Sequence, residues 1–241
     1  MSRRSLLSIP RCLLETYDDD WLESVSGPAL RPGGLELTKR ALDMISIQPG
    51  AKVIDAGCGT GATLELLNSL GYDALGLDLN DVLLARASAC GKTLKVSFDD
   101  TSLPSGCADA ILAECVLNLC QNRKKALLEF HRLLSKNGYL IISDLCLKPG
   151  TDRDQKNPNR KRGCAKGAAE LNFTLNLLKK IGYFIVSYQD QENALKNLSA
   201  ALVWRYGLKD GLGRLGLMGA DCRFKPGDLT YALIIAQKKS S

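Results

Sequence analysis

The sequence predicts an α/β fold in which a mostly parallel β-sheet carries helices on both faces. Short apolar segments of strand length alternate with segments of helical periodicity from residue 52 onward, and this alternation is typical of parallel sheets with helical crossovers. A glycine-rich turn, GCGTG at residues 57–61, joins the first strand to the first of these helices. The chain has 241 residues and is 45% apolar, which suits one domain with a full core and a small appendage.

Residues 1–50 are expected to form a helical preamble or lid. The apolar residues of GLELTKRALDMI have helical spacing, and the QPG that follows ends the helix. The stretch GPALRPGG before it is rich in proline and glycine, as a hinge would be. Residues 31–34 are therefore candidates for closing over a pocket and excluding water.

Residues 51–241 are expected to form the main domain. The predicted strands cover residues 52–57, 73–79, 94–100, 108–116, 139–146, 183–190 and 229–239. The predicted helices cover residues 61–71, 80–91 (capped by Asn80), 121–138, 168–182 and 192–207. A basic loop at 148–166 and a Gly-rich segment at 207–227 lie between them. The Gly-rich segment is a second candidate for a lid, or for docking a partner protein.

The charge pattern argues against a general nucleic-acid binder. The net charge is only +6, and residues 148–166 hold seven Lys or Arg against two Asp. Nucleic-acid binders more often spread basic residues along a face, with aromatic residues between them for stacking. No aromatic residue interrupts this loop. The loop is either a solvated face or a site for an acidic accessory protein or a phosphorylated substrate.

The cysteine pattern indicates reduced thiols. There are nine cysteines and no CxxC pair, so neither a disulfide framework nor a structural metal site is expected. The apolar run near the N-terminus breaks at Pro10 and Arg11, which is too early for a signal peptide. No stretch approaches the ~20 apolar residues of a membrane span. The expected location is the cytoplasm.

The glycine turn is compatible with two kinds of nucleotide cofactor. Gly57-x-Gly59-x-x-Ala62 satisfies the dinucleotide motif. Three features favour S-adenosylmethionine (SAM) instead. Asp55 precedes the glycines where it can face an ammonium group, Gly61 makes the loop roomier, and about fifty residues precede the loop. A nicotinamide-dependent oxidoreductase is the weaker hypothesis.

Acidic residues at later strand ends extend the case for SAM. Asp78, followed by Leu79, ends the second predicted strand, where a carboxylate can accept both ribose hydroxyls. Asp99 ends the third predicted strand and can accept from an adenine amino group, with Asp100 as a competing candidate. The expected cofactor-binding residues are therefore Asp55, Gly57, Cys58, Gly59, Gly61, Asp78, Leu79, Asp99 and Asp100.

With these motifs, the chain resembles the class I SAM-dependent methyltransferases from about residue 35 to its end. The resemblance is carried by VIDAGCGTG, GLDLN, FDDTSLP and ALLEFHRLLSKNGYLIISD. It implies a Rossmann-like, seven-stranded sheet whose last strand is antiparallel, and a product, S-adenosylhomocysteine (SAH). The segment LTYALIIAQKK would supply the antiparallel strand.

Within that class, the chain resembles the arsenite methyltransferases. Cys115 begins their Cys-Val-x-Asn-Leu run in AECVLNLC, and Cys164 occupies the place of a second thiol before a Gly-Ala step in GCAKGAAELNF. The resemblance implies a pair of thiols above the methyl donor, suited to a soft substrate. Basic residues on both sides of Cys164 favour its thiolate. Those enzymes commonly carry a third cysteine, in the helix after the glycine loop or in the N-terminal region. Here Ala62 and Thr63 follow the loop and that helix has no cysteine, which leaves Cys12, Cys120 and Cys222 as candidates.

Other roles for these residues stay open. Cys115 is equally compatible with core packing at a strand end, and Cys164 with an inert loop thiol. Glu114 is the acid nearest the expected methyl group, and it would orient an oxygen or nitrogen nucleophile or accept its proton. The one histidine, His131, lies in an apolar helix and is interpreted as structural. The alternatives are therefore O-, N- or C-methylation of a small metabolite, or a non-catalytic SAM-binding module.

Overall fold

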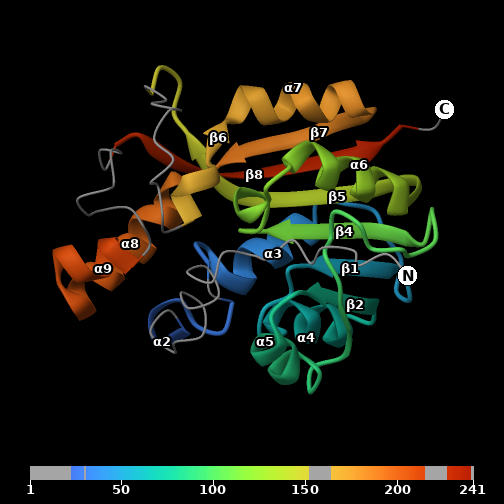
Figure 1. Cartoon of the computed structure of the whole chain (residues 1–241), viewed down its shortest axis with the longest axis horizontal. Coiled ribbons are helices and arrows are strands. Elements are labelled where there is room, and N and C mark those ends of the chain that lie inside the picture. Colours follow the sequence, from blue (N-terminus) through green and yellow to red (C-terminus); the bar gives the residue numbers. More distant parts are fainter. Residues whose placement is uncertain (1–22, 30, 152–163, 215–226, 240–241) are drawn as a thin grey trace, which may run out of the picture.

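The computed structural model describes residues 23–29, 31–151, 164–214 and 227–239. Within them, a central sheet has the strand order β3-β2-β1-β4-β5-β8-β7, and the short β6 pairs with β5 (Figure 1). The strands are β1 (Lys52–Ala56), β2 (Asp73–Asp78), β3 (Lys92–Lys95), β4 (Ala108–Glu114), β5 (Leu134–Leu147), β6 (Ala169–Glu170), β7 (Tyr183–Asp190) and β8 (Leu229–Lys238). β8 runs antiparallel to both of its neighbours, β5 and β7, and the other pairs of described strands are parallel. The predicted fold, with its antiparallel last strand, is confirmed.

Helices cover both faces of the sheet. They are α2 (Glu23–Ser26), α3 (Gly34–Leu42), α4 (Ala62–Ser69), α5 (Asp81–Ala87), α6 (Arg123–Leu133), α7 (Leu171–Ile181), α8 (Glu192–Tyr206) and α9 (Leu208–Arg214), with the 3₁₀ turns η1 (Leu117–Leu119) and η2 (Cys164–Gly167). α6 and α7 pack on one face, and α3, α4 and α8 pack on the other. In Figure 1, α2 and α8 both lie toward the left of the view. They are in contact, since the Ser24 hydroxyl of α2 is 3.0 Å from the Tyr206 hydroxyl of α8.

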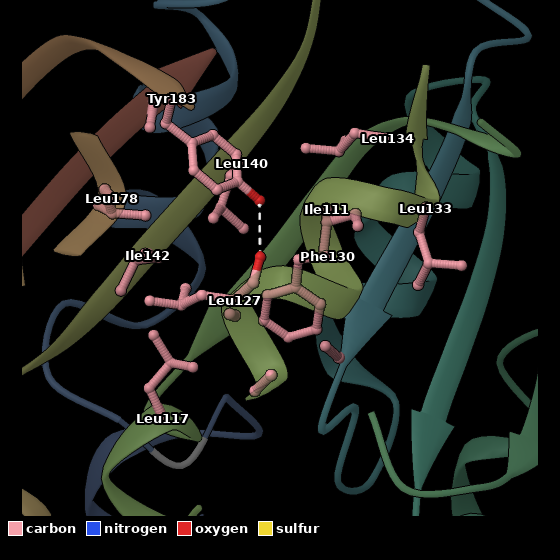
Figure 2. Close-up of a cluster of buried hydrophobic side chains, with 14 of the residues drawn as sticks. Ile111, Leu117, Leu127, Phe130, Leu133, Leu134, Leu140, Ile142, Leu178 and Tyr183 are labelled. Carbon is pink, nitrogen blue, oxygen red and sulfur yellow. Dashed lines mark hydrogen bonds between the residues drawn. The ribbon is translucent and has the colours of Figure 1, made fainter. Parts of the chain in front are cut away.

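Alternating side chains divide the core into two layers. On β1, Val53 packs toward α3 and α4, whereas Ile54 and Ala56 pack toward α6. Figure 2 shows the α6 layer, in which the Tyr183 hydroxyl donates to the Leu127 carbonyl at 3.3 Å. Because successive strand residues face opposite sides, Asp55 faces the α3–α4 layer, as does Glu114 at the end of β4.

One sequence-based expectation, the extent of the third strand, is wrong in detail. The third strand ends at Lys95 instead of residue 100, because the chain turns at Ser97, whose carbonyl accepts from the Asp100 amide at 3.1 Å. Asp99 and Asp100 therefore lie in a turn beyond the strand. From the predicted preamble, Leu37, Ala41 and Leu42 of α3 are buried in the same core as α4.

Candidate cofactor and acceptor site

The glycine loop lies between the ends of β1, β2 and β4. The amides of Gly57 and Cys58 donate to the Leu77 carbonyl of β2 at 2.7 and 3.0 Å. Gly57 has φ 79°, and a Cβ there would lie 2.2 Å from Val116 Cγ1, so only glycine lets the loop pack against the end of β4. A Cβ at Gly59 would meet no described atom within 4 Å. The loop therefore offers open backbone beside a tightly packed turn, as a cofactor cradle requires.

Asp78 is fixed where β2 meets this loop. Its Oδ2 accepts from the Gly59 amide at 3.0 Å, and its Oδ1 accepts from the amides of Leu79 and Asn80 at 2.7 and 2.9 Å. These backbone donors hold a half-buried carboxylate beside the cradle. Asn80 caps α5 as predicted, because its side chain accepts from the Val82 amide at 2.8 Å.

The two acids after β3 differ in exposure. The Asp99 side chain is 28% exposed and the Asp100 side chain 70%. Asp99 Oδ1 accepts from the Ser97 hydroxyl at 2.5 Å, whereas both acids lie 3.7 Å from Lys125 Nζ. Asp99, which is less exposed and held by Ser97, is the better candidate for an adenine contact.

Cys58 does not direct its side chain into the cradle. The thiol is buried with Leu84 and Ala87 of α5, and it fills the space beside Gly76, where a Cβ would lie 2.7 Å from Cys58 Sγ. Burial raises the pKa of this thiol well above its ordinary value, and the charges of Asp55 and Asp78 add to that rise. The expected contact with a cofactor can therefore involve only the Cys58 backbone.

A buried charge cluster joins the ends of β1 and β4 to the N-terminal segment. Arg31 Nη2 lies 2.7 Å from Glu114 Oε2 and donates to the Thr63 hydroxyl of α4 at 3.0 Å. Glu114 Oε1 accepts from the Thr38 hydroxyl of α3 at 2.9 Å. The Thr63 hydroxyl donates to Glu114 Oε2 at 3.3 Å. The Glu114 carboxylate is thus held by one cation and two hydroxyls, which makes it a poor candidate for a general base.

Asp55 is the unsatisfied member of this cluster. Its Oδ2 is buried and has no hydrogen-bond partner among the described residues. Burial raises the pKa of Asp55 to about 7, and the charge of Glu114 adds to the rise, while Arg31 opposes it. A buried acceptor without a partner is rare in folded proteins. An ammonium group would satisfy it, so the cluster fits the amino-acid end of SAM.

Cys115 lies immediately after Glu114 in an uncommon backbone conformation. Its φ is +57°, a value that few residues other than glycine adopt. The thiol is half-buried, and its Sγ lies 3.2 Å from the Tyr231 hydroxyl of β8. That hydroxyl also donates to Ser143 Oγ at 3.1 Å. Tyr231 is fully buried, and burial raises its pKa well above the ordinary value.

Cys164 is the first residue of η2, which packs directly on η1. A Cβ at Gly167 would lie 1.9 Å from the Asn118 carbonyl oxygen. Arg123 Nη2 donates to the Gly167 carbonyl at 2.7 Å, and Asn118 Nδ2 donates to buried Asp144 Oδ1 at 2.7 Å. Since η1 follows Cys115 closely, the chain brings the backbones of both predicted thiol positions to one end of the sheet.

Some predicted features lie outside the described residues, and some residues of the site were missed. The basic run at 160–162 and most of the Gly-rich segment are outside them. Arg31 was expected only in a lid, and neither Thr38 nor Tyr231 was expected at all. Thr38, a polar residue on the apolar face of α3, was the one available signal. His131 stacks edge-on against Tyr183 at 5.1 Å on the α6 face, as a structural residue would.

The middle of the chain matches a known family. Residues 54–142 match the model described as a methyltransferase domain. This segment is therefore similar to methyltransferase domains. Phosphoethanolamine N-methyltransferase 3 of Arabidopsis thaliana is 31% identical over 127 residues, which cover 49% of this chain and 26% of that enzyme. The chain therefore spans about a quarter of the length of the curated relatives it matches first.

Solved structures share the fold of this segment and of its flanking elements. Phosphoethanolamine N-methyltransferase 2 of Haemonchus contortus, solved with SAM, has a TM-score of 0.78 at 16% identity, covering 98% of this chain and 61% of that one. The [4+2]-cyclase SpnF has a TM-score of 0.73 at 18% identity, covering 94% and 96%. At such identities the likeness concerns the fold alone.

The described residues contain neither a membrane-spanning helix nor a metal-holding cluster. No helix in this part of the chain combines the length and the apolar composition needed to cross a membrane. No group of three or more His, Cys, Asp or Glu side chains in the same residues is arranged to hold a metal ion.

Proposed function

We propose that this protein is a SAM-dependent methyltransferase whose acceptor is a small, soft nucleophile: a trivalent metalloid, a thiol or a selenium compound. The methyltransferase domain match over residues 54–142 supports the reaction class. Asp55 would hold the ammonium group of SAM, Asp78 the ribose hydroxyls and Asp99 the adenine amino group. The open backbone at Gly59 leaves room for the cofactor between them.

The acceptor proposal rests on one observation, the packing of η2 on η1. Gly167 touches Asn118 so closely that only glycine fits, and this contact brings the start of η2, at Cys164, toward the segment that begins at Cys115. The positive φ of Cys115 adds support, since strained residues cluster at functional sites. Two thiols at one end of the sheet would bind a soft acceptor beside the methyl donor.

Methyl transfer requires mainly that the acceptor be positioned in line with the methyl group. When bound, SAM would supply a methyl group on a sulfonium. The acceptor's lone pair would bond to the methyl carbon as the carbon–sulfur bond breaks, and SAH would leave. Holding an acceptor in line is worth roughly 7–11 kcal/mol of the barrier. A soft or already deprotonated nucleophile needs no strong base, and Glu114 is already paired with Arg31. The proposed site therefore suits a thiolate or metalloid better than an alcohol.

The test compares variants of the two proposed acceptor cysteines with a variant of a cysteine at the far end of β4. Cys115→Ser and Cys164→Ser should each lower methyl transfer from labelled SAM to arsenite or a small thiol by at least tenfold. SAH affinity, measured by calorimetry, should stay unchanged. Cys107→Ser is the matched control, because Cys107 precedes the opposite end of β4. Normal turnover by both Cys115→Ser and Cys164→Ser would rule out the soft-acceptor proposal.

A second candidate is N-methylation of a small phosphorylated amine. The sequence match to phosphoethanolamine N-methyltransferases favours it, and the basic loop at 148–166 would bind the phosphate. Phosphoethanolamine should then be methylated, and Cys115→Ser and Cys164→Ser should retain full activity toward it. Because the resemblance to SpnF concerns a cyclase, SAM binding with no labelled acceptor would instead favour a role without methyl transfer, with an accessory protein docked at the basic loop.

The redox state of the cysteines indicates the cellular compartment. None of the six cysteines that the structure describes with their side chains forms a disulfide. Free thiols persist in reducing compartments, so we propose a cytoplasmic location.

A further inference from the structure

The Tyr231 hydroxyl lies where it can act on the Cys115 thiol. Its oxygen is 3.2 Å from Cys115 Sγ, and the Tyr231 side chain, on β8, is fully buried. Burying a hydroxyl costs free energy unless it is hydrogen-bonded, and a phenylalanine would fill the same space without that cost. The hydroxyl therefore needs partners, and it finds them in Cys115 and Ser143.

Ser143 of β5 holds both members of this pair. Its carbonyl accepts from the Cys115 amide at 2.7 Å and from the Tyr231 hydroxyl at 3.3 Å. Its hydroxyl oxygen is buried and lies 3.1 Å from the Tyr231 hydroxyl. Because one strand residue fixes the backbone of Cys115 and the side chain of Tyr231, the central sheet sets the contact between the sulfur and the tyrosine oxygen.

The three side chains form a hydrogen-bonded chain that suits either form of the thiol. A hydroxyl has one hydrogen to donate, can also accept, and rotates to suit its partners. When Cys115 carries its proton, the thiol can donate to the Tyr231 oxygen while Tyr231 donates to Ser143. A thiolate can only accept, so the Tyr231 hydrogen then turns to the sulfur and the Ser143 hydroxyl can donate to the Tyr231 oxygen.

The surroundings keep Tyr231 a donor and place a positive charge near the sulfur. Burial raises the pKa of Tyr231 well above its ordinary value, and the charge of Cys115 adds to that rise, so the hydroxyl keeps its hydrogen at neutral pH. The Arg31 guanidinium acts electrostatically on both Tyr231 and Cys115. The opposing charge of Glu114, which precedes Cys115, is paired with Arg31 at 2.7 Å.

We propose that Tyr231 is a positioning residue of the acceptor site, whose hydroxyl donates to the Cys115 sulfur, stabilises the thiolate and fixes the direction in which it meets a soft acceptor. This inference rests on the proposed function. Hydrogen bonds to a charged partner are stronger than neutral ones and favour the charged form. With arsenite, a sulfur–arsenic bond forms as one arsenic–oxygen bond breaks, and the thiol proton leaves with that hydroxide as water. The sulfur keeps a lone pair that accepts from Tyr231 throughout.

The test compares Tyr231→Phe with the matched control Tyr183→Phe. Each removes one hydroxyl from a buried tyrosine, but the Tyr183 hydroxyl donates to the Leu127 carbonyl in the α6 layer (Figure 2). Iodoacetamide alkylation of Cys115, followed by peptide mass spectrometry across a pH series, measures the thiolate without SAM or acceptor. In Tyr231→Phe the alkylation midpoint should move to higher pH, whereas Tyr183→Phe should keep the wild-type midpoint.

The expected size of the effect follows from the lost hydrogen bond. Losing a hydrogen bond to a charged group lowers the thiolate fraction about tenfold, whereas the more basic thiolate is about threefold more nucleophilic. Below both midpoints, alkylation of Tyr231→Phe should therefore be about threefold slower than in the wild type. Methyl transfer from labelled SAM to arsenite should fall about tenfold, with SAH affinity within twofold of the wild type.

The outcomes separate this role from the proposed function. An unshifted alkylation profile in Tyr231→Phe, or equal losses in Tyr231→Phe and Tyr183→Phe, would overturn the positioning role while leaving soft-acceptor methylation intact. Should Tyr231→Phe fail to fold, Ser143→Ala removes the hydroxyl that supports Tyr231 and should shift the midpoint in the same direction. If the wild type methylates no soft acceptor, the proposed function fails, and the positioning role fails with it.

Discussion

Replacing Gly167 by alanine tests the assembly of the acceptor site without touching either thiol. An alanine Cβ would lie 1.9 Å from the Asn118 oxygen, 2.6 Å from its carbonyl carbon and 2.8 Å from its Cα. Ordinary contact begins at 3.4 Å, so η2 and η1 must separate by about 1.5 Å, the difference between 3.4 and 1.9 Å. All three atoms are backbone, so no side chain can rotate away to relieve the clash.

The cost of Gly167→Ala follows from that separation. Overpacking of this kind typically costs about 1–3 kcal/mol, and the Arg123 bond to the Gly167 carbonyl, 2.7 Å long, is lost or stretched. For a chain of this size, each kcal/mol lowers the melting temperature by about 2–4 °C. A misplacement near 1 Å can also cost about 100-fold in rate. We therefore expect reduced stability, a large loss of turnover and unchanged SAH affinity.

Thermal unfolding, SAH calorimetry and methyl transfer to arsenite or a thiol measure these three quantities. Gly227→Ala is the matched control, because a Cβ there meets no described atom within 4 Å. A Gly167→Ala variant with the melting temperature and turnover of the wild type would refute the argument that this contact positions η2.

Two further predictions concern Asp55 and Cys115. Burial raises the pKa of Asp55 from 3.8 to about 7, so its folding contribution is fully present below pH 4 and is lost as the pH rises toward 7. Without ligand, the melting temperature of Asp55→Asn should therefore exceed that of the wild type at pH 8. The two melting temperatures should converge near pH 4. Equal melting temperatures at pH 8 would contradict the raised pKa of Asp55. Because Cys115 has φ +57°, Cys115→Gly should be about 1 kcal/mol more stable than Cys115→Ala by denaturant unfolding, and the reverse order would show that the left-handed backbone is unstrained.

Most of the fold was predictable because its buried strands are apolar runs in the sequence. The predicted bounds of β7, 183–190, are the observed ones. β3 was misplaced because its four residues, Lys92–Lys95, are exposed or only half-buried and give no apolar signal. The apolar signal came instead from Val96 and Phe98, which pack against the core from an irregular segment.

The candidate site was predictable only where one segment carries the information. The glycine loop and Asp78 stand in sequence motifs, and their local geometry follows from those motifs. Arg31 was missed because arginine is rarely buried, and because its partners Glu114 and Thr63 come from distant parts of the chain. The role of Gly167 depends likewise on Asn118, a contact that no local pattern records.

The end of β4 explains how one strand can serve both halves of the proposed site. Glu114 faces the α3–α4 layer, and simple alternation would turn Cys115 toward α6. The left-handed backbone at Cys115 instead keeps the thiol with Tyr231, which belongs to the α3–α4 layer. Two successive residues thereby face the same layer, one paired with Arg31 and the other available to an acceptor. A change at Glu114 should then affect the cofactor, whereas changes at Cys115 and Gly167 should affect the acceptor alone.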